Sequence, residues 1–217
     1  MQMTYLRLWV LTNVLGFMLS LLSISVISFV GPLGNGLSAA GWGLGLALGG
    51  MQASVLRRRL IQLKVWHWMV ATGLGTYVGS ALSAFSNLLF IMTGQGVLSI
   101  ALKFFPSFAE SMASTLMSGL LLVGHEISIG ISVGIAQVLV VRRYTPNWRL
   151  WWTMGLLGFT LGGTIVFYGA LSVVGLILDI SWASMIRGLC FGAVGGVIYG
   201  SITAIALKKL RPRQHRI

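Results

Sequence analysis

The sequence predicts an all-α, polytopic membrane protein whose six transmembrane helices form three parallel helical hairpins around a pseudo-threefold axis. Three observations support this fold class. The 217-residue chain has a mean hydropathy of +0.90 and 8% charged residues, against about a quarter in soluble domains. Its apolar residues form long runs, and the borders of these runs carry one short pattern three times. A lipid bilayer is therefore the expected surrounding of most side chains.

Apolar runs of roughly 20 residues, the length that crosses about 30 Å of hydrocarbon, define the expected spans. They cover about 8–30, 36–56, 66–92, 115–141, 149–178 and 185–207. The longest runs exceed the hydrocarbon thickness, so we expect those helices to tilt, kink or project beyond the outer surface. In this interpretation residues 1–217 form a single transmembrane domain.

Basic residues orient the bundle, because short loops rich in lysine and arginine stay in the cytoplasm. Of the 15 basic residues, 13 fall on one side, and only Lys103 and Arg187 fall on the other. Both termini are therefore predicted to be cytoplasmic. The net charge of +12 lies in short loops at the membrane edge, which favours contact with anionic lipid head groups over nucleic-acid binding.

Each pair of spans opens with a basic residue, a tryptophan and a glycine at fixed spacing, and closes with two basic residues. The openings are Arg7/Trp9/Gly16, Lys64/Trp66/Gly73 and Arg149/Trp151/Gly158, and the closings are Arg57-Arg58, Arg142-Arg143 and Lys208-Lys209. Around the second and third openings the sequences agree at a constant offset of 85 residues, which places Gln52 over Gln137. The three repeat units, about 7–58, 64–143 and 149–209, run parallel because each begins and ends in the cytoplasm.

The second unit is the longest, because it carries additional residues at about 93–113. This insert is apolar, with Pro106 as a helix breaker and Lys103 and Glu110 as its only charges. We expect an interfacial helix on the external face. A re-entrant loop is the alternative.

Glycines recur every four residues in the second helix of each unit, and therefore share one helical face. The positions of interest are Gly45, Gly49, Gly130, Gly134, Gly192 and Gly196. Without side chains they let helix backbones approach closely in lipid, so we predict helix–helix contacts there. A narrow path, or a flat surface for a planar cofactor, is the alternative.

Glu126 and its neighbour His125 form the most suggestive polar pair, since an acid within a span is costly and is by default a functional hypothesis. Glu126 lies about 24 Å along the helix from Arg142, towards the external boundary. Two interpretations stay open. The acid is an interfacial group satisfied by Arg187, His125 or water, or it belongs to a transport path.

Two catalytic patterns in the same helix are incomplete. His125-Glu126 begins the zinc signature His-Glu-x-x-His, but Ile129 occupies the position of the second ligand. Gly130-Ile-Ser132-Val-Gly134 matches Gly-x-Ser-x-Gly, yet lies in an apolar helix rather than in a strand-to-helix turn. We therefore predict neither a metal site nor an enzyme.

Two repeated amides and a histidine complete the candidate residues. Gln52 and Gln137 each precede a basic pair by five residues, and a buried amide needs hydrogen-bond partners. We expect hydrogen bonds between neighbouring units, and a ring of polar groups on the axis, completed by Thr203, is the alternative. His67 lies in the aromatic belt on the cytoplasmic side, where a pigment ligand is conceivable and a belt residue is the simpler interpretation.

The pattern Gly-x3-Gly-x2-Gln-x4-Arg-Arg, followed by a tryptophan, resembles that of small multipass proteins of cyanobacteria and other bacteria to which no activity is attached. It is carried by Gly45, Gly49, Gln52, Arg57, Arg58 and Trp66, and by Gly130, Gly134, Gln137, Arg142, Arg143 and Trp151. The resemblance covers nearly the whole chain and implies architecture only. We expect the protein to lie in a bacterial inner or thylakoid membrane. Mitochondrial carriers also have three hairpins, but their Pro-x-Asp/Glu-x-x-Lys/Arg signature is absent from this sequence.

Two functional classes are compatible with these features. The scarcity of polar residues and the short loops favour a non-enzymatic accessory subunit of a larger membrane complex, photosynthetic or respiratory, that contacts other membrane subunits and binds lipids or pigments. The repeat, Glu126 and the glutamines favour a small transporter or channel with a polar path along the axis. Transporters usually have broken helices and several polar groups at mid-membrane, so we prefer the first class.

Overall fold

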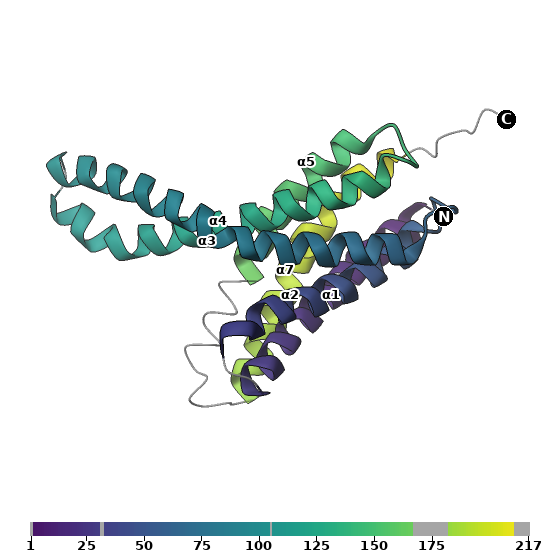
Figure 1. The fold of residues 1–217 in the computed structure, drawn as a ribbon, viewed down its shortest axis with the longest axis horizontal. Helices are drawn as coiled ribbons and strands as arrows, with labels where there is room; N and C mark the ends of the chain where they lie inside the picture. The colour runs from purple at the N-terminus through teal and green to yellow at the C-terminus, as the bar shows by residue number, and fades with distance from the viewer. Residues whose placement is uncertain (1, 31–32, 105, 167–181, 211–217) are drawn as a thin grey trace.

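The computed structural model is all-helical, with no strand in the part of the chain that it describes (Figure 1). It describes residues 2–30, 33–104, 106–166 and 182–210, without the side chains of 2–3, 20–30, 33–44, 84, 97, 101, 106–118, 122, 182–185, 187 and 188. The helices are α1 (Gln2–Val30), α2 (Leu33–Leu56), α3 (Val65–Phe104), α4 (Pro106–Val141), α5 (Trp148–Gly158) and α7 (Trp182–Lys209). A π-helical turn, η1 (Phe159–Gly163), continues α5.

The helices close into a ring in chain order. Each packs against the helix before it and the helix after it, and α7 completes the ring by packing against α1 as well as against α5 and η1. One face of every helix therefore contributes to the interior.

Two aromatic layers fill this interior. Trp151 makes edge-to-face contacts with Trp9 and Trp68, at centroid distances of 5.7 and 5.4 Å, and all three rings are buried. Further along the helices Tyr199 packs against Phe17 and Phe159, at 5.5 and 4.7 Å. Such T-shaped and tilted pairs of aromatic rings are favourable beyond their buried area, so both layers hold neighbouring helices together.

Within the described residues, three helical segments are long and apolar enough to cross a membrane: Phe85–Phe104, Gly119–Val141 and Leu189–Lys209. The apolar stretches of α1 and α2 within the described residues, Thr4–Leu19 and Gly45–Leu56, are shorter. These helices are compatible with a membrane protein, while six spans stay a prediction. Residues 167–178 of the predicted fifth span lie outside the described part of the chain.

The second hairpin differs from the predicted one. Helix α3 continues to Phe104, so residues 93–104 prolong it and do not form a separate interfacial helix or a re-entrant loop. Its 40 residues correspond to about 60 Å, twice the hydrocarbon thickness. Pro106 begins α4, in the first turn, where amide hydrogens have no acceptor within the helix and the missing one costs no hydrogen bond. Figure 1 shows that this long hairpin extends well away from the other helices.

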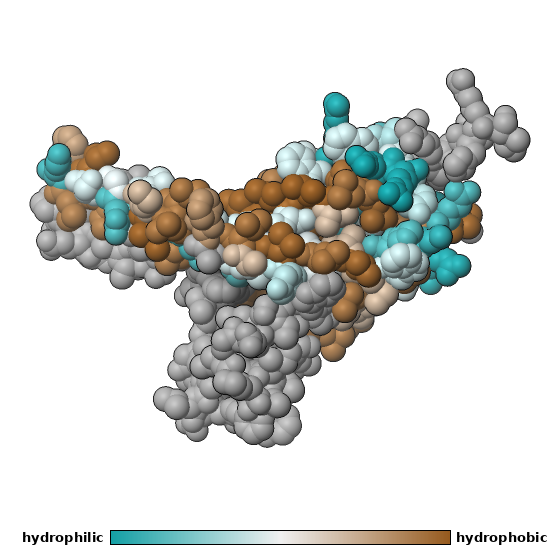
Figure 2. Space-filling view, in the orientation of Figure 1, coloured by the Kyte–Doolittle hydropathy of each residue, from teal (hydrophilic) through white to brown (hydrophobic). Residues whose placement is uncertain are grey.

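The basic residues gather at the opposite end of the molecule. Figure 2 shows hydrophilic residues at the end that carries the N-terminus, where the α2–α3 and α4–α5 turns also lie. Both turns bind the end of α7. The Arg59 guanidinium donates to the Leu207 and Lys208 carbonyls, and Asn147 Nδ2 donates to the Lys209 carbonyl at 2.6 Å. These bonds satisfy carbonyls that the helix end leaves without partners.

We predict that this basic end faces the cytoplasm. In a Cys190→Ser background, a cysteine at the exposed position Gln62 should react with a membrane-impermeant thiol reagent only from the cytoplasmic side. The matched Phe104→Cys variant, at the far tip of α3, should react only from the other side. The reverse pattern would overturn the topology, because the asymmetry of basic residues is its only basis.

Candidate functional site

The buried tryptophans donate hydrogen bonds to polar side chains of the neighbouring helices. Trp68 Nε1 donates to Gln52 Oε1 at 3.2 Å, and Trp151 Nε1 donates to Gln137 Oε1 at 3.1 Å. Trp9 Nε1 donates to Thr203 Oγ1 at 2.9 Å, which joins α1 to α7. The same kind of bond, from an indole to a side-chain oxygen of the preceding helix in the ring, is therefore made three times.

Gln52 is the centre of this network and is fully buried. Its Nε2 donates to Asn13 Oδ1 at 2.8 Å and to the Tyr199 hydroxyl at 3.5 Å. Its Oε1 accepts from Trp68 and, at 3.4 Å, from Gln137 Nε2. An amide offers two donors and two acceptor positions, and all four are used.

Gln137 extends the network to α3 and α5. Its Nε2 donates to Thr72 Oγ1 at 3.0 Å as well as to Gln52, and its Oε1 accepts from Trp151. Through these bonds the network includes side chains of all six helices. The described part of the chain has three buried side-chain atoms without a hydrogen-bond partner, Tyr5 Oη, Asn87 Oδ1 and Trp152 Nε1, and none belongs to the network.

From the sequence, the tryptophans at the basic end are expected to be anchors in the cytoplasmic aromatic belt, and the structure corrects this for three of them; the six are Trp9, Trp66, Trp68, Trp148, Trp151 and Trp152. Trp9, Trp68 and Trp151 are at most 1% exposed, so they are core residues and not belt anchors. Trp66, which the sequence aligned with Trp151, is 59% exposed, and Trp68 takes the buried position instead. The polar partners Asn13, Thr72 and Tyr199 were missed. Asn13 and Thr72 each lie four residues after a buried tryptophan and bond to its carbonyl, as an amide or hydroxyl four residues on in a helix can do.

The six glycines singled out in the sequence all lie at contacts with another helix. A Cβ on Gly45 would lie 2.6 Å from Gly73 Cα, and one on Gly49 would lie 2.9 Å from Thr72 Cβ. The corresponding atoms on Gly130, Gly134, Gly192 and Gly196 would approach Phe159 or Leu156, Trp152, Met18 and Val14, at 3.1, 2.6, 3.0 and 2.5 Å. These glycines therefore bring α2 against α3, α4 against α5, and α7 against α1, as small residues do in membrane bundles.

Glu126 lies apart from the network and is 5% exposed. Its Oε1 is 3.9 Å from His125 Nε2, and its Oε2 lies against Gly163, where a Cβ would overlap it. Gly163 belongs to η1, and single π-helical turns within α-helices occur frequently at functional sites. The predicted partner Arg187 cannot be placed here, because its side chain lies outside the described residues.

His67 does not approach the network. Its ring packs against Trp66 with a centroid distance of 3.8 Å at the basic end. Among the described residues no group of three or more His, Cys, Asp or Glu side chains is arranged to hold a metal ion. The hydrogen-bond network around Gln52 and Gln137 joins helices to one another.

Comparison with protein-family models, with curated protein sequences and with solved structures found no match to this chain.

Proposed function

We propose that this protein is a non-enzymatic integral subunit, in a bacterial inner or thylakoid membrane, that packs against a larger membrane complex through the outer half of α3. One observation carries the proposal. The segment Phe85–Phe104 is apolar enough to span a membrane, yet only 6% of its most apolar stretch is buried inside the protein. The corresponding shares are 47% in Gly119–Val141 and 39% in Leu189–Lys209. The protein itself leaves this helix almost uncovered.

Polar groups on the same segment favour a protein partner over lipid alone. Gln95 is exposed in the middle of the apolar stretch, and Thr93 and Ser99 are exposed on either side of it. Lipid chains cannot satisfy an amide, whereas a neighbouring helix can. Figure 2 shows hydrophobic residues along much of the visible surface of this hairpin.

The arrangement of three hairpins belongs to the same proposal. The threefold use of an indole-to-oxygen bond between successive helices, at Trp9, Trp68 and Trp151, supports a pseudo-threefold bundle. In that bundle the hydrogen-bond network around Gln52 and Gln137 stabilises the fold, and the long α3–α4 hairpin is free to contact the partner complex.

The proposal is tested by isolating the full-length protein in mild detergent and identifying what remains bound in stoichiometric amounts. We expect a membrane-protein partner, photosynthetic or respiratory, and its loss when Gly96 is replaced by leucine. A Cβ at Gly96 has no neighbour within 4 Å, so this substitution should leave the fold intact while blocking close approach of another helix. Ser201→Leu, at an exposed site on α7, is the matched control. The proposal would be overturned if the protein purifies alone, or if the Gly96→Leu variant retains as much of the partner as the wild type.

A small transporter is the second candidate, and the buried Glu126 beside η1 is the observation that favours it. The saturated hydrogen bonds of Gln52 and the aromatic layers oppose it, because among the described side chains of the network none is left unpaired for a solute.

We therefore predict that purified protein in liposomes conducts no more protons or monovalent cations than protein-free liposomes, and that Glu126→Gln changes nothing. A wild-type flux that disappears in Glu126→Gln, at an unchanged unfolding temperature, would favour the transporter instead.

A further inference from the structure

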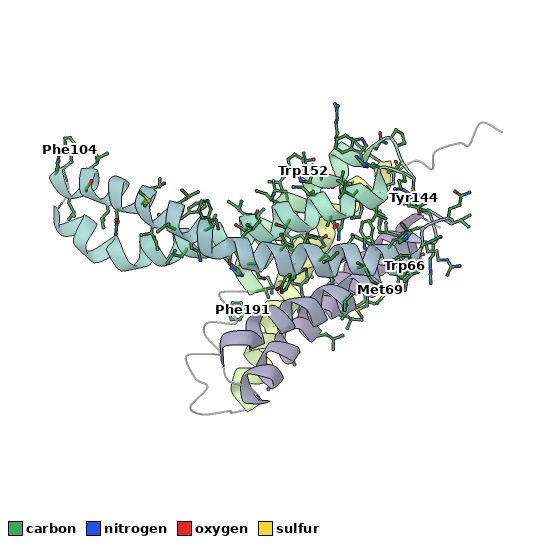
Figure 3. The ribbon with its side chains drawn as sticks, viewed as in Figure 1. Trp66, Met69, Phe104, Tyr144, Trp152 and Phe191 are labelled. Atoms are coloured by element: carbon green, nitrogen blue, oxygen red, sulfur yellow. The ribbon has the colours of Figure 1, made fainter. Side chains whose placement is uncertain are left out.

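The α2–α3 turn forms an open groove at the basic end of the molecule. Its volume is about 530 Å³, within the range of about 300–1,000 Å³ typical of small-molecule sites. The lining combines two cationic side chains, Arg57 and Lys64, with the apolar side chains of Ile61, Trp66 and Met69. Figure 3 shows Trp66 and Met69 near one another at this end.

Within the described residues the two cations have no acidic side chain to pair with. The sequence contains three acidic residues, and Glu126, the only one whose side chain the structure describes, lies about 24 Å along α4 from the basic end. Arg57 and Lys64 are both exposed, whereas Arg59 in the same turn is bound to the carbonyls of α7. Among the described residues nothing neutralises Arg57 and Lys64, so the groove offers both cations to an anion from outside.

The apolar side of the groove indicates that this anion carries a hydrocarbon part. Ile61 is 80% exposed and Trp66 is 59% exposed, directly beside the two cations. Tryptophan at a membrane boundary places its ring at the level of the lipid head groups. A phosphate group with attached acyl chains satisfies both halves of the groove, whereas a free phosphate satisfies only the cations.

The corresponding α4–α5 turn is built differently. The buried amide and the buried indole that flank it, Gln137 and Trp151, are 14 positions apart. Gln52 and Trp68, which flank the α2–α3 turn, are 16 positions apart. Its cation Arg149 lies over the Trp148 ring, 5.4 Å from the centroid, and its Asn147 binds the end of α7. The two additional positions thus belong to the turn that forms the groove.

We propose that the α2–α3 turn binds one anionic phospholipid, with the phosphate between Arg57 and Lys64 and the acyl chains along Trp66 and Met69. This inference is independent of the partner of α3. The site selects lipids of net negative charge because two cations face a single head group.

The test uses delipidated full-length protein and native mass spectrometry with added phosphatidylglycerol or phosphatidylcholine. We expect one phosphatidylglycerol to bind at least about tenfold more tightly than phosphatidylcholine. The double variant Arg57→Gln/Lys64→Gln should remove this preference. The control Arg142→Gln/Arg149→Gln loses the same charge at the same end and should keep it.

A second measurement locates the bound lipid. Phosphatidylglycerol with brominated acyl chains should quench tryptophan emission more in the wild type than in Trp66→Phe. Trp66 is 59% exposed in the groove, whereas the other five tryptophans whose side chains the structure describes are buried or half-buried. Equal losses in both charge variants would show diffuse electrostatic attraction and overturn the site. Displacement of the lipid by millimolar glycerol phosphate would overturn its assignment to lipid, since a water-soluble phosphate would then suffice.

Discussion

Replacing Gly196 with leucine should unfold the bundle or prevent its assembly. A Cβ at this position would lie 2.5 Å from Val14 Cα and 2.8 Å from the Asn13 carbonyl oxygen. These are backbone atoms, so no change of rotamer can make room, and α7 has to move away from α1. We expect a cost of at least about 3 kcal/mol, the upper part of the range for overpacking.

The measurement is thermal or denaturant unfolding in detergent, together with the elution volume. Gly155→Ala provides the control, because a Cβ there meets nothing within 4 Å. It should leave stability unchanged or raise it by up to about 1 kcal/mol, the difference in helix propensity between alanine and glycine. If Gly196→Leu unfolds at the temperature of the wild type, the close approach of α7 and α1 is wrong.

Contacts of this kind were predictable from the sequence, because they follow from local regularities. A glycine every four residues marks one helical face whatever surrounds the helix. Gln52 and Gln137 recur at equivalent positions, and an amide within an apolar run requires partners. Both features are repeated, so chance agreement is improbable.

The register of the second unit was not predictable, because the sequence offers two equivalent solutions. Trp66 with Gly73 and Trp68 with Gly75 have the same spacing as Trp9 with Gly16. Only packing distinguishes them. Burial of Trp68 brings its indole to Gln52 and leaves Trp66 at the surface.

The length of α3 could not be predicted from the sequence either. An apolar segment beyond a span can continue the helix or turn along the membrane surface, and the two have similar composition. The sequence predicts that Pro106 interrupts a helix, and in the structure Pro106 is the first residue of α4. Tyr199 and Asn13 were missed because the corresponding positions of the other units hold no tyrosine or asparagine, so the repeat gives no signal there.

Replacing Gln52 with leucine is the second substitution for which we expect a large effect. The side chains are similar in size, so the change removes hydrogen bonds rather than volume. Trp68 Nε1 and Asn13 Oδ1 would lose the partners they have in α2, in a region from which water is excluded. Each buried polar atom left without a partner costs about 1–3 kcal/mol, so the variant should lose about 2–6 kcal/mol of unfolding free energy.

A double-mutant cycle separates this network from general packing. In a Trp68→Phe background the indole donor is already absent, so Gln52→Leu should cost about 1–2 kcal/mol less than in the wild type. Ser54→Ala, which removes an exposed hydroxyl one turn from Gly50, should change stability by less than about 0.5 kcal/mol. Additive costs for Gln52→Leu and Trp68→Phe would mean that the two side chains do not interact, because coupled neighbours depart from additivity and independent sites do not.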